Sequence, residues 1–444
     1  MKNLLQLKPL IITLLILLLC LPLGLIGELV NERHQLSSEV RKDIANASSR
    51  AQQISGPILL LETEHYRDEP QAGGTVVTAS RQIRTILPAE LQVDTTLSSE
   101  VRRRGIYQSR LYHSQHQLRA TFALPTDLGF GQLPQISPPP QPGAIRLVSA
   151  RFILAVSDIR GFNGMPQLTM DQQQLTIQPG TGVNGLTGVQ APLDLATLTK
   201  AGRWQLDVAL NLSGTDELSL LGAAAASQWQ LTADWPHPGF TGRFLPQQRD
   251  ISAKGFRALW QSTLFSNDVQ PSLELCINQG DCDNLALHSF AVSLVEPVDH
   301  YQQSSRAVKY ALMVLVVSFA VFYLFEVLAA VQIHPMQYLF VGLALAMFYL
   351  LLLSLAEVIG FALAYLAASS CCITLLGIYT TAVLGSRAKA ALCCAGLSAL
   401  YALLFLILGA EDLALLAGSA LMFLVLAGVM LSTRQLNWYQ LPPR

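Results

Sequence analysis

The sequence carries little charge. Asp, Glu, Lys and Arg make up 13% of its 444 residues, whereas soluble globular proteins contain roughly 25% of these residues. The deficit is local, because residues 9–30 and 307–433 are almost uncharged while residues 31–306 contain an ordinary share. This distribution excludes a single soluble domain and indicates a membrane protein with one large soluble part.

The sequence also lacks the basic balance of a nucleic-acid-binding protein. Its formal net charge is −1, and proteins that bind nucleic acids are usually strongly basic. The densest basic run, Arg102 to Arg104, has no aromatic residues interleaved with it and is typical of a solvated edge. We therefore expect no nucleic acid among the partners.

Common catalytic and nucleotide-binding motifs are missing as well. The sequence contains no G-x-S-x-G, H-E-x-x-H or Walker pattern. The stretch GTGVNG at residues 180–185 matches G-x-G-x-x-G, but a dinucleotide site needs a helix to begin there. The following LTGVQAPLDL contains another glycine and a proline instead. We predict a glycine-rich turn between strands and no cofactor.

The histidines of the soluble part do not form a metal motif. His113 and His116 in YHSQHQ have a ligand-like spacing only on a helix, since residues three apart in a strand point to opposite faces. No carboxylate or cysteine lies close to them in sequence, and His237 is held between two prolines in DWPHPGF. We predict two surface histidines, a rigid turn and no metal site.

Only two of the seven cysteines fall in the soluble part. Cys276 and Cys282 occur in CINQGDC and can close a small loop. We predict a disulfide if this part faces an oxidising compartment; the alternative is a pair of unbonded surface thiols. The other cysteines lie in apolar segments, where a free thiol behaves as a small apolar side chain: Cys20, Cys371, Cys372, Cys393 and Cys394.

Six apolar segments are long enough to cross a membrane. Residues 9–30 form an uncleaved anchor, because about 20 apolar residues span a bilayer and no signal-peptide cleavage site follows. Lys2 and Lys8 place residues 1–8 in the cytoplasm by the positive-inside rule. The remaining five spans are predicted at 307–331, 336–355, 358–380, 388–408 and 412–433.

The loops agree with six spans and two cytoplasmic termini. Arg387 and Lys389 fall in a predicted cytoplasmic loop, whereas Glu411 and Asp412 fall on the outer side. The C-terminal segment, 434–444, contains two arginines and an aromatic pair suited to the interface: Arg434, Arg444, Trp438 and Tyr439.

Residues 31–306 have the pattern of a β-rich domain with a helical start. Within 31–52, Leu36, Val40 and Ile44 recur at helical spacing. Beyond them, stretches such as RWQLDVALNLSG alternate apolar and polar residues, as half-buried antiparallel strands do, and no strong helical period appears before residue 305. The predicted fold is an α+β membrane protein. Its large extracytoplasmic, sandwich-like β-domain is inserted between an N-terminal transmembrane helix and a five-helix transmembrane bundle.

Three polar residues in the apolar part merit a functional hypothesis. Glu326 and His334 lie eight residues apart in FEVLAAVQIHPMQYL, or about 12 Å along one helix. Pro335 should end that helix at or before His334. Glu357 lies about 30 Å away across the bilayer. One alternative is that these residues form an ion-binding or catalytic group. We favour the other, that they are boundary and packing residues, because they do not cluster near the bilayer midplane, where transporters keep their sites.

Long stretches of the sequence resemble the CreD family of bacterial inner-membrane proteins. The matches include ALNLSGTDELSLLG (209–222), DWPHPGFTGRFLPQQRDISAKGFRALWQS (234–262), residues 325–361 around HPMQYL, TRQLNWY (433–439) and residues 32–61. Two features differ from the family pattern. Gln332-Ile333 stands where an arginine is expected before His-Pro, and the cysteine pair is not a family feature.

This resemblance implies an inner-membrane protein of Gram-negative bacteria. The family is linked to envelope integrity, to a two-component stress or nutrient response and to altered colicin tolerance, and it supplies no catalytic residues. We expect a non-enzymatic protein that acts through its periplasmic β-domain. Its expected partners are the lipid bilayer and an unidentified envelope protein or peptidoglycan component, and its oligomeric state is open. The alternatives are a transporter or channel, and a membrane hydrolase built on Glu326 and His334.

Overall fold

A computed structural model describes most of the chain, which forms two compact units. The described residues are 2–71, 74–132, 134–137, 141–199, 202–294, 300–329, 333–409 and 414–434. The predictions that concern Gln332, Glu411, Asp412, Trp438, Tyr439 and Arg444 lie outside them. One unit combines Met1–Glu39 with Val298–Arg444, and the other is Val40–Pro297.

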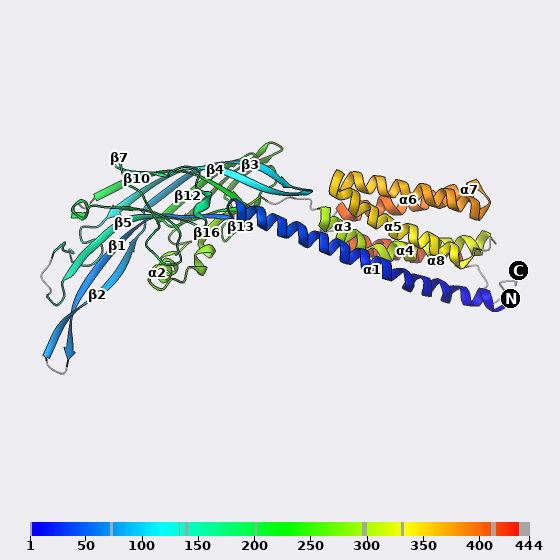
Figure 1. Ribbon diagram of the computed structural model, residues 1–444, viewed down its shortest axis with the longest axis horizontal. Coiled ribbons are helices and arrows are strands. Elements are labelled where there is room, and N and C mark those ends of the chain that lie inside the picture. Colours follow the sequence, from blue (N-terminus) through cyan, green and yellow to red (C-terminus); the bar gives the residue numbers. More distant parts are fainter. Residues whose placement is uncertain are drawn as a thin grey trace. The chain divides into compact units, whose positions relative to one another are not determined.

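The first unit is a bundle of helices (Figure 1). In the described residues, four helices are long and apolar enough to cross a membrane: α1 (Lys2–Ala47), α5 (Pro335–Ile359), α6 (Phe361–Leu384) and α7 (Arg387–Gly409). Helices α3 (His300–Lys309) and α4 (Ala311–Ala329) would form a fifth span, bent by 44°. The last helix, α8 (Ala414–Thr433), is also apolar.

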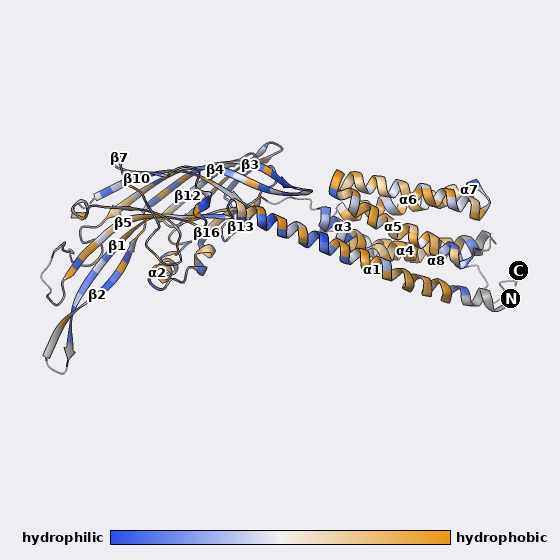
Figure 2. Ribbon diagram, viewed as in Figure 1, coloured by the Kyte–Doolittle hydropathy of each residue, from blue (hydrophilic) through white to orange (hydrophobic). Residues whose placement is uncertain are grey.

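Two helix boundaries differ from the sequence-based prediction. The helix predicted over 31–52 is the end of α1, which stops at Ala47. The span predicted over 307–331 starts earlier, at His300, and breaks at Tyr310 between α3 and α4. Figure 2 shows apolar residues along α5, α6, α7 and the first part of α1, while the last turns of α1 are polar.

Helix α1 packs into the bundle through one apolar stripe. Leu19, Leu23, Ile26 and Val30 are buried, and their three- and four-residue spacing places them on one face. Close packing depends on Gly342 of α5, where a Cβ atom would lie only 2.2 Å from Cδ1 of Leu19. Small residues at such crossings are typical of helix packing in membranes.

The second unit contains two β-sheets that share one apolar core. The first sheet has the order β13 (Gly239–Gly242), β16 (Ser289–Ser293), β11 (Glu217–Leu221), β1 (Gln52–Gln71), β5 (Ile145–Val156), β9 (Gly188–Pro192) and β8 (Gln178–Pro179), with β2 (Gly74–Ile86) paired to β1. The second has the order β14 (Gln248–Ser252), β15 (Gly255–Thr263), β12 (Ala226–Ala233), β3 (Glu90–Arg104), β4 (Tyr107–Leu124), β10 (Gly202–Thr215), β6 (Gln167–Met170) and β7 (Gln173–Gln174).

Alternating side chains bring the two sheets together. The burial of β12 alternates residue by residue, so Trp229 points inward and stacks on Trp260 at 4.7 Å between ring centroids. Phe122 of the second sheet contacts Phe152 of the first at 5.1 Å. Most strand pairs are antiparallel, as expected, but β1 runs parallel to β11 and β12 runs parallel to β3.

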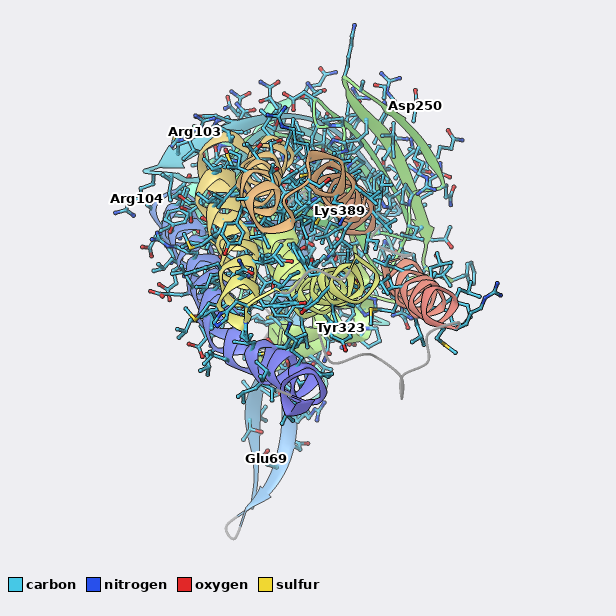
Figure 3. The ribbon with its side chains drawn as sticks, turned by 90° about the vertical axis from the view of Figure 1, so that its right-hand side faces the viewer. Glu69, Arg103, Arg104, Asp250, Tyr323 and Lys389 are labelled. Carbon is cyan, nitrogen blue, oxygen red and sulfur yellow. A yellow bond between two sulfur atoms is a disulfide. The ribbon has the colours of Figure 1, made fainter. Side chains whose placement is uncertain are left out.

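The β-unit also presents two long hairpins to solvent. The β1–β2 hairpin extends beyond the other strands of this unit (Figure 1), and Glu69 lies near its end (Figure 3). The β3–β4 hairpin carries Arg103 and Arg104, which point outward (Figure 3) and are exposed. The stretch at residues 180–185 lies in the connection between β8 and β9, so no helix begins there.

Four helical elements in the described part of the β-unit were not predicted from the sequence, and two of them are the short 3-10 helices η1 (Ile159–Gly161) and η2 (Leu195–Thr199). Helix α2 (Gln270–Gln279) and the 3-10 helix η3 (Asp283–His288) lie between β15 and β16. Leu273, Cys276 and Leu285 bury their side chains against Ile58 and Ile153 of the first sheet. A disulfide joins Cys276 of α2 to Cys282, which directly precedes η3.

Candidate functional site in the membrane unit

Glu326 is the centre of a polar cluster formed by three helices. Lys8 of α1 forms an ion pair with Oε1 of Glu326. Tyr338 of α5 donates its hydroxyl to Oε2 at 2.9 Å, and the Ile333 backbone N–H donates to Oε1 at 3.4 Å. The side chains of Lys8 and Glu326 are only 17% and 10% exposed. The carboxylate is therefore paired and hydrogen-bonded inside the bundle, which is the condition for tolerating a buried charge.

The sequence-based site residues include neither Lys8 nor Tyr338 as a partner of Glu326. In the sequence, Lys8 indicates only the orientation of the first span, whereas in the structure its ammonium group pairs with a residue more than 300 positions away. A signal was present, because the two opposite charges stand alone near the cytoplasmic ends of apolar spans in the predicted topology. This charge complementarity suggests the pair, but it does not show that α1 packs beside α4 rather than beside another helix.

His334 belongs to a helix cap and does not join Glu326. The residue is the N-cap of α5, where its Nδ1 accepts a hydrogen bond from the Met336 N–H at 3.2 Å. The Gln337 side chain accepts from the His334 N–H at 2.9 Å, which completes a capping box. Pro335 occupies the first helical position, where its missing N–H does no harm. Local helix chemistry thus accounts for the histidine.

A small cavity lies beside the Glu326 cluster. It offers about 10 Å³ to the centre of a water-sized sphere, which is room for about one water molecule. It shares Tyr338 and Ile333, which precedes α5, with the cluster. The other lining residues belong to α4, α5 and α6: Phe322, Gln337, Val341, Tyr379, Thr380 and Val383. Its size suits a bridging water better than a transported solute.

Glu357 forms a separate polar contact near the other end of α5. Tyr301 of α3 donates its hydroxyl to Oε1 of Glu357 at 3.2 Å. The Tyr301 ring also contacts the ring of His34 on α1, at 6.2 Å between centroids. Tyr338 and Glu357 are 19 residues apart on α5, or about 28 Å along the helix axis. The two clusters therefore tie α1 to the bundle at two different depths.

The polar groups between these clusters are neutral. Tyr365 donates its hydroxyl to the backbone oxygen of Tyr401 at 2.7 Å, and the Tyr401 hydroxyl contacts Sγ of Cys372 at 3.4 Å. The Tyr349 hydroxyl is buried and has no hydrogen-bond partner. This layer contains hydroxyl and thiol groups, and it can bind α5, α6 and α7 together without a buried charge.

The prediction of two surface histidines in the β-unit is wrong for His116. Both residues lie on β4, on opposite faces as predicted, but His116 is only 2% exposed. Its ring nitrogens contact the hydroxyls of Thr95 at 2.9 Å and Ser114 at 2.8 Å. Burial lowers the pKa of His116 to about 3. A local signal was present, because His116 has the same strand parity as Leu118 and Phe122 and therefore lies on the inward face of β4 with them.

Comparison with known proteins identifies the family. A family model described as "Inner membrane protein CreD" matches residues 4–439. The chain belongs to the CreD family. The inner membrane protein CreD of Escherichia coli (strain K12) is 36% identical over 425 residues, which cover 96% of this chain and 91% of that protein. The predicted family is thus confirmed, and so is a membrane protein with an N-terminal apolar helix, a large β-sheet domain and C-terminal apolar helices. The CreD relative is named as an inner membrane protein, and its name indicates no reaction.

Proposed function

We propose that this protein supports the integrity of the Gram-negative cell envelope through its β-unit. In this proposal the chain crosses the inner membrane six times, with α3 and α4 together as the second span and α8 as the sixth. Both termini are cytoplasmic and the β-unit is periplasmic. The protein acts within a two-component stress or nutrient response. The main support for the proposal is that this chain, a member of the CreD family, contains both apolar helices and a large unit of two β-sheets.

The β-unit supplies the surface for contact with the envelope. Its core is filled by packed aromatic side chains, so binding uses the outer faces and the two hairpins. Glu69 and Arg103 lie on these hairpins and carry opposite charges to solvent (Figure 3). The proposed partner is an envelope protein or a component of peptidoglycan, bound without a chemical reaction at the membrane carboxylates.

The geometry of the membrane unit weakens the two alternatives. A transporter needs a polar path, but the cavity beside Glu326 holds about one water molecule, and Lys8 already neutralises the carboxylate. A hydrolase on Glu326 and His334 needs the two side chains in contact. Instead, His334 caps α5 while Glu326 pairs with Lys8 and Tyr338.

Photo-crosslinking in cells tests the proposed contact directly. A photoreactive amino acid is placed at Glu69 or Arg103 on the hairpins, and captured species are identified by mass spectrometry. The same amino acid at Phe340, an exposed residue of α5, serves as a control that should capture membrane components. We expect a specific envelope component from the hairpin positions. Capture of no specific envelope component from either hairpin would contradict the proposal.

A permeability assay tests the physiological part. Cells that lack the protein should take up more of a membrane-impermeant dye under envelope stress, and the wild-type gene should restore the barrier. Equal dye uptake with and without the gene would refute a role in envelope integrity.

A further inference from the structure

Three polar side chains of the β-unit form a hydrogen-bonded chain outside the site described above. Ser272 Oγ on α2 lies 3.1 Å from Nε2 of His288, the last residue of η3. Nδ1 of the same ring lies 2.7 Å from Oδ1 of Asn267, which precedes α2. The order hydroxyl, imidazole, amide oxygen is the arrangement by which an imidazole activates a serine nucleophile.

The contacts of Asn267 fix which imidazole nitrogen carries the proton. Nδ2 of Asn267 donates to the backbone oxygens of Gly222 at 3.3 Å and of His288 at 3.2 Å. Its Oδ1 is therefore the acceptor toward the ring, and Nδ1 of His288 must be the donor. Nε2 then has a free lone pair, and the Ser272 hydroxyl donates to it. This is the tautomer in which His288 can remove the serine proton.

The burial of this group suits a base. Asn267 is 2% and His288 is 8% exposed, while Ser272 is only half-buried. Burial lowers the pKa of His288 most, and the nearby positive charge of Arg243 lowers it further. The negative charge of Asp268 has the opposite, smaller effect. The imidazole therefore stays neutral at neutral pH, behind a serine that solvent can reach.

Two features of the fold hold Ser272 in place. Ser272 is the third residue of α2, and no side chain caps this helix. Its backbone N–H consequently has no partner within the helix and can donate to a developing oxyanion. The Cys276–Cys282 disulfide connects α2 with the start of η3. It thereby constrains the two elements that carry Ser272 and His288.

We propose that Ser272, His288 and Asn267 form a nucleophilic site that cleaves carboxylic esters. Ser272 Oγ attacks the ester carbonyl carbon, and its proton passes to Nε2 of His288. The bond to the alcohol breaks, and the departing oxygen takes that proton. Water then attacks the acyl-serine, gives a proton to His288 and releases the carboxylic acid, while Ser272 regains its proton. Asn267 is a positioning residue, since it acts through His288.

Neighbouring apolar residues indicate the class of ester. Phe265, Leu275 and Leu287 are exposed although large and apolar. Phe265 lies two residues before Asn267, Leu275 lies one helical turn after Ser272, and Leu287 is adjacent to His288. An apolar acyl chain is the substrate part that such side chains favour. The reaction goes beyond the proposed envelope role, which requires none.

A fluorophosphonate probe tests the nucleophile. The full-length protein in detergent is incubated with the probe, and the labelled residue is identified by mass spectrometry. We expect labelling at Ser272, its loss in Ser272→Ala, and a decrease of about 100-fold or more in His288→Gln. Ser266→Ala, at an exposed serine nearby, is the matched control and should be labelled at the wild-type rate.

Further measurements separate a nucleophilic site from a structural network. Tryptophan fluorescence melts must show that Ser272→Ala remains folded. Asn267→Ala should slow labelling and move the midpoint of its pH profile to lower pH, because Nδ1–H loses its acceptor while Arg243 and Asp268 are unchanged. Absence of labelling at Ser272 in the folded wild-type protein would overturn the proposal. An unchanged midpoint of the pH profile in Asn267→Ala would overturn the positioning role of Asn267.

Discussion

At the scale of single residues, several polar groups in apolar surroundings are paired with partners from other elements. Lys8 and Glu326 pair between α1 and α4, and His116 contacts Thr95 on the neighbouring strand. Removing one partner leaves a buried polar group without compensation, which is more harmful than removing both. The effect of a substitution therefore depends on what remains.

The ion pair of the membrane unit should show this asymmetry. Lys8→Met leaves Glu326 buried and unpaired, and we expect it to lower the apparent free energy of unfolding by about 3–5 kcal/mol. The double variant Lys8→Met/Glu326→Gln should lose less than Lys8→Met alone. Unfolding in mixed detergent and SDS measures the difference. Lys309→Met, at an exposed lysine of α3, is the control, and additive losses in the double variant would disprove the coupling.

His116 should make the β-unit sensitive to acid. The folded pKa is about 3 and the unfolded pKa is about 6.5, so below pH 6.5 only the unfolded state binds the proton. Stability is therefore fully present above pH 6.5 and falls as the pH decreases toward 3. At pH 5 the loss should be about 2 kcal/mol.

Tryptophan fluorescence during urea unfolding at pH 7 and pH 5 checks the loss, because Trp229 and Trp260 are buried in this unit. His116→Gln should show a smaller difference between the two pH values. His113→Gln, on the opposite face of β4, should keep the wild-type difference. An unchanged difference in His116→Gln would assign the acid sensitivity to other groups.

At the scale of elements, helix ends explain residues that first suggest chemistry. The sequence HPMQ contains the parts of a helix start, namely a side-chain acceptor, a proline at the first position and a glutamine at the third. The sequence-based prediction included neither the break between α3 and α4 nor helix α2. Both α2 and α3 are ten residues long, and a segment that short gives only a weak helical period.

The role of His334 as the N-cap of α5 can be tested by its effect on stability. His334→Ala removes the acceptor for the Met336 N–H and should destabilise the bundle by about 1 kcal/mol, whereas His334→Asn should retain most of that stability. Thermal melts in detergent measure both variants. If His334→Asn is as unstable as His334→Ala, the capping role is wrong.

At the scale of the whole molecule, the proposed function requires the β-unit to lie in the periplasm. The Cys276–Cys282 disulfide provides a chemical marker for it, because disulfides persist in the periplasm and are rare in the cytosol. Cells with normal periplasmic oxidation should yield the bonded pair, and cells without the periplasmic thiol oxidase should yield free thiols.

Alkylation of the denatured protein, followed by mass spectrometry, reads both states. Cys371, a free thiol of α6, should be alkylated in either strain and serves as the internal control. Free thiols at positions 276 and 282 in wild-type cells would contradict a periplasmic β-unit. A fluorescent protein at the C-terminus, bright only in the cytoplasm, tests the sixth span in the same cells.

The sequence alone determined the division into apolar helices and a β-rich part, together with the family. These properties depend on local composition, on periods of two and 3.6 residues, and on long continuous matches. The possible disulfide in CINQGDC was likewise suggested by local sequence, because its two cysteines are only six residues apart. Such local patterns can be predicted from the sequence because each segment contacts either lipid or water, and that contact favours apolar or polar residues in the segment itself.

Only the tertiary structure decided which distant residues meet. The pairing of Lys8 with Glu326, the burial of His116 and the chain from Asn267 through His288 to Ser272 each join different elements. Their partners are selected by helix packing and strand register, which place residues far apart in the sequence within hydrogen-bond distance. A residue type and its neighbours do not encode that choice, because the free energy of a buried polar group depends on what the fold brings to it.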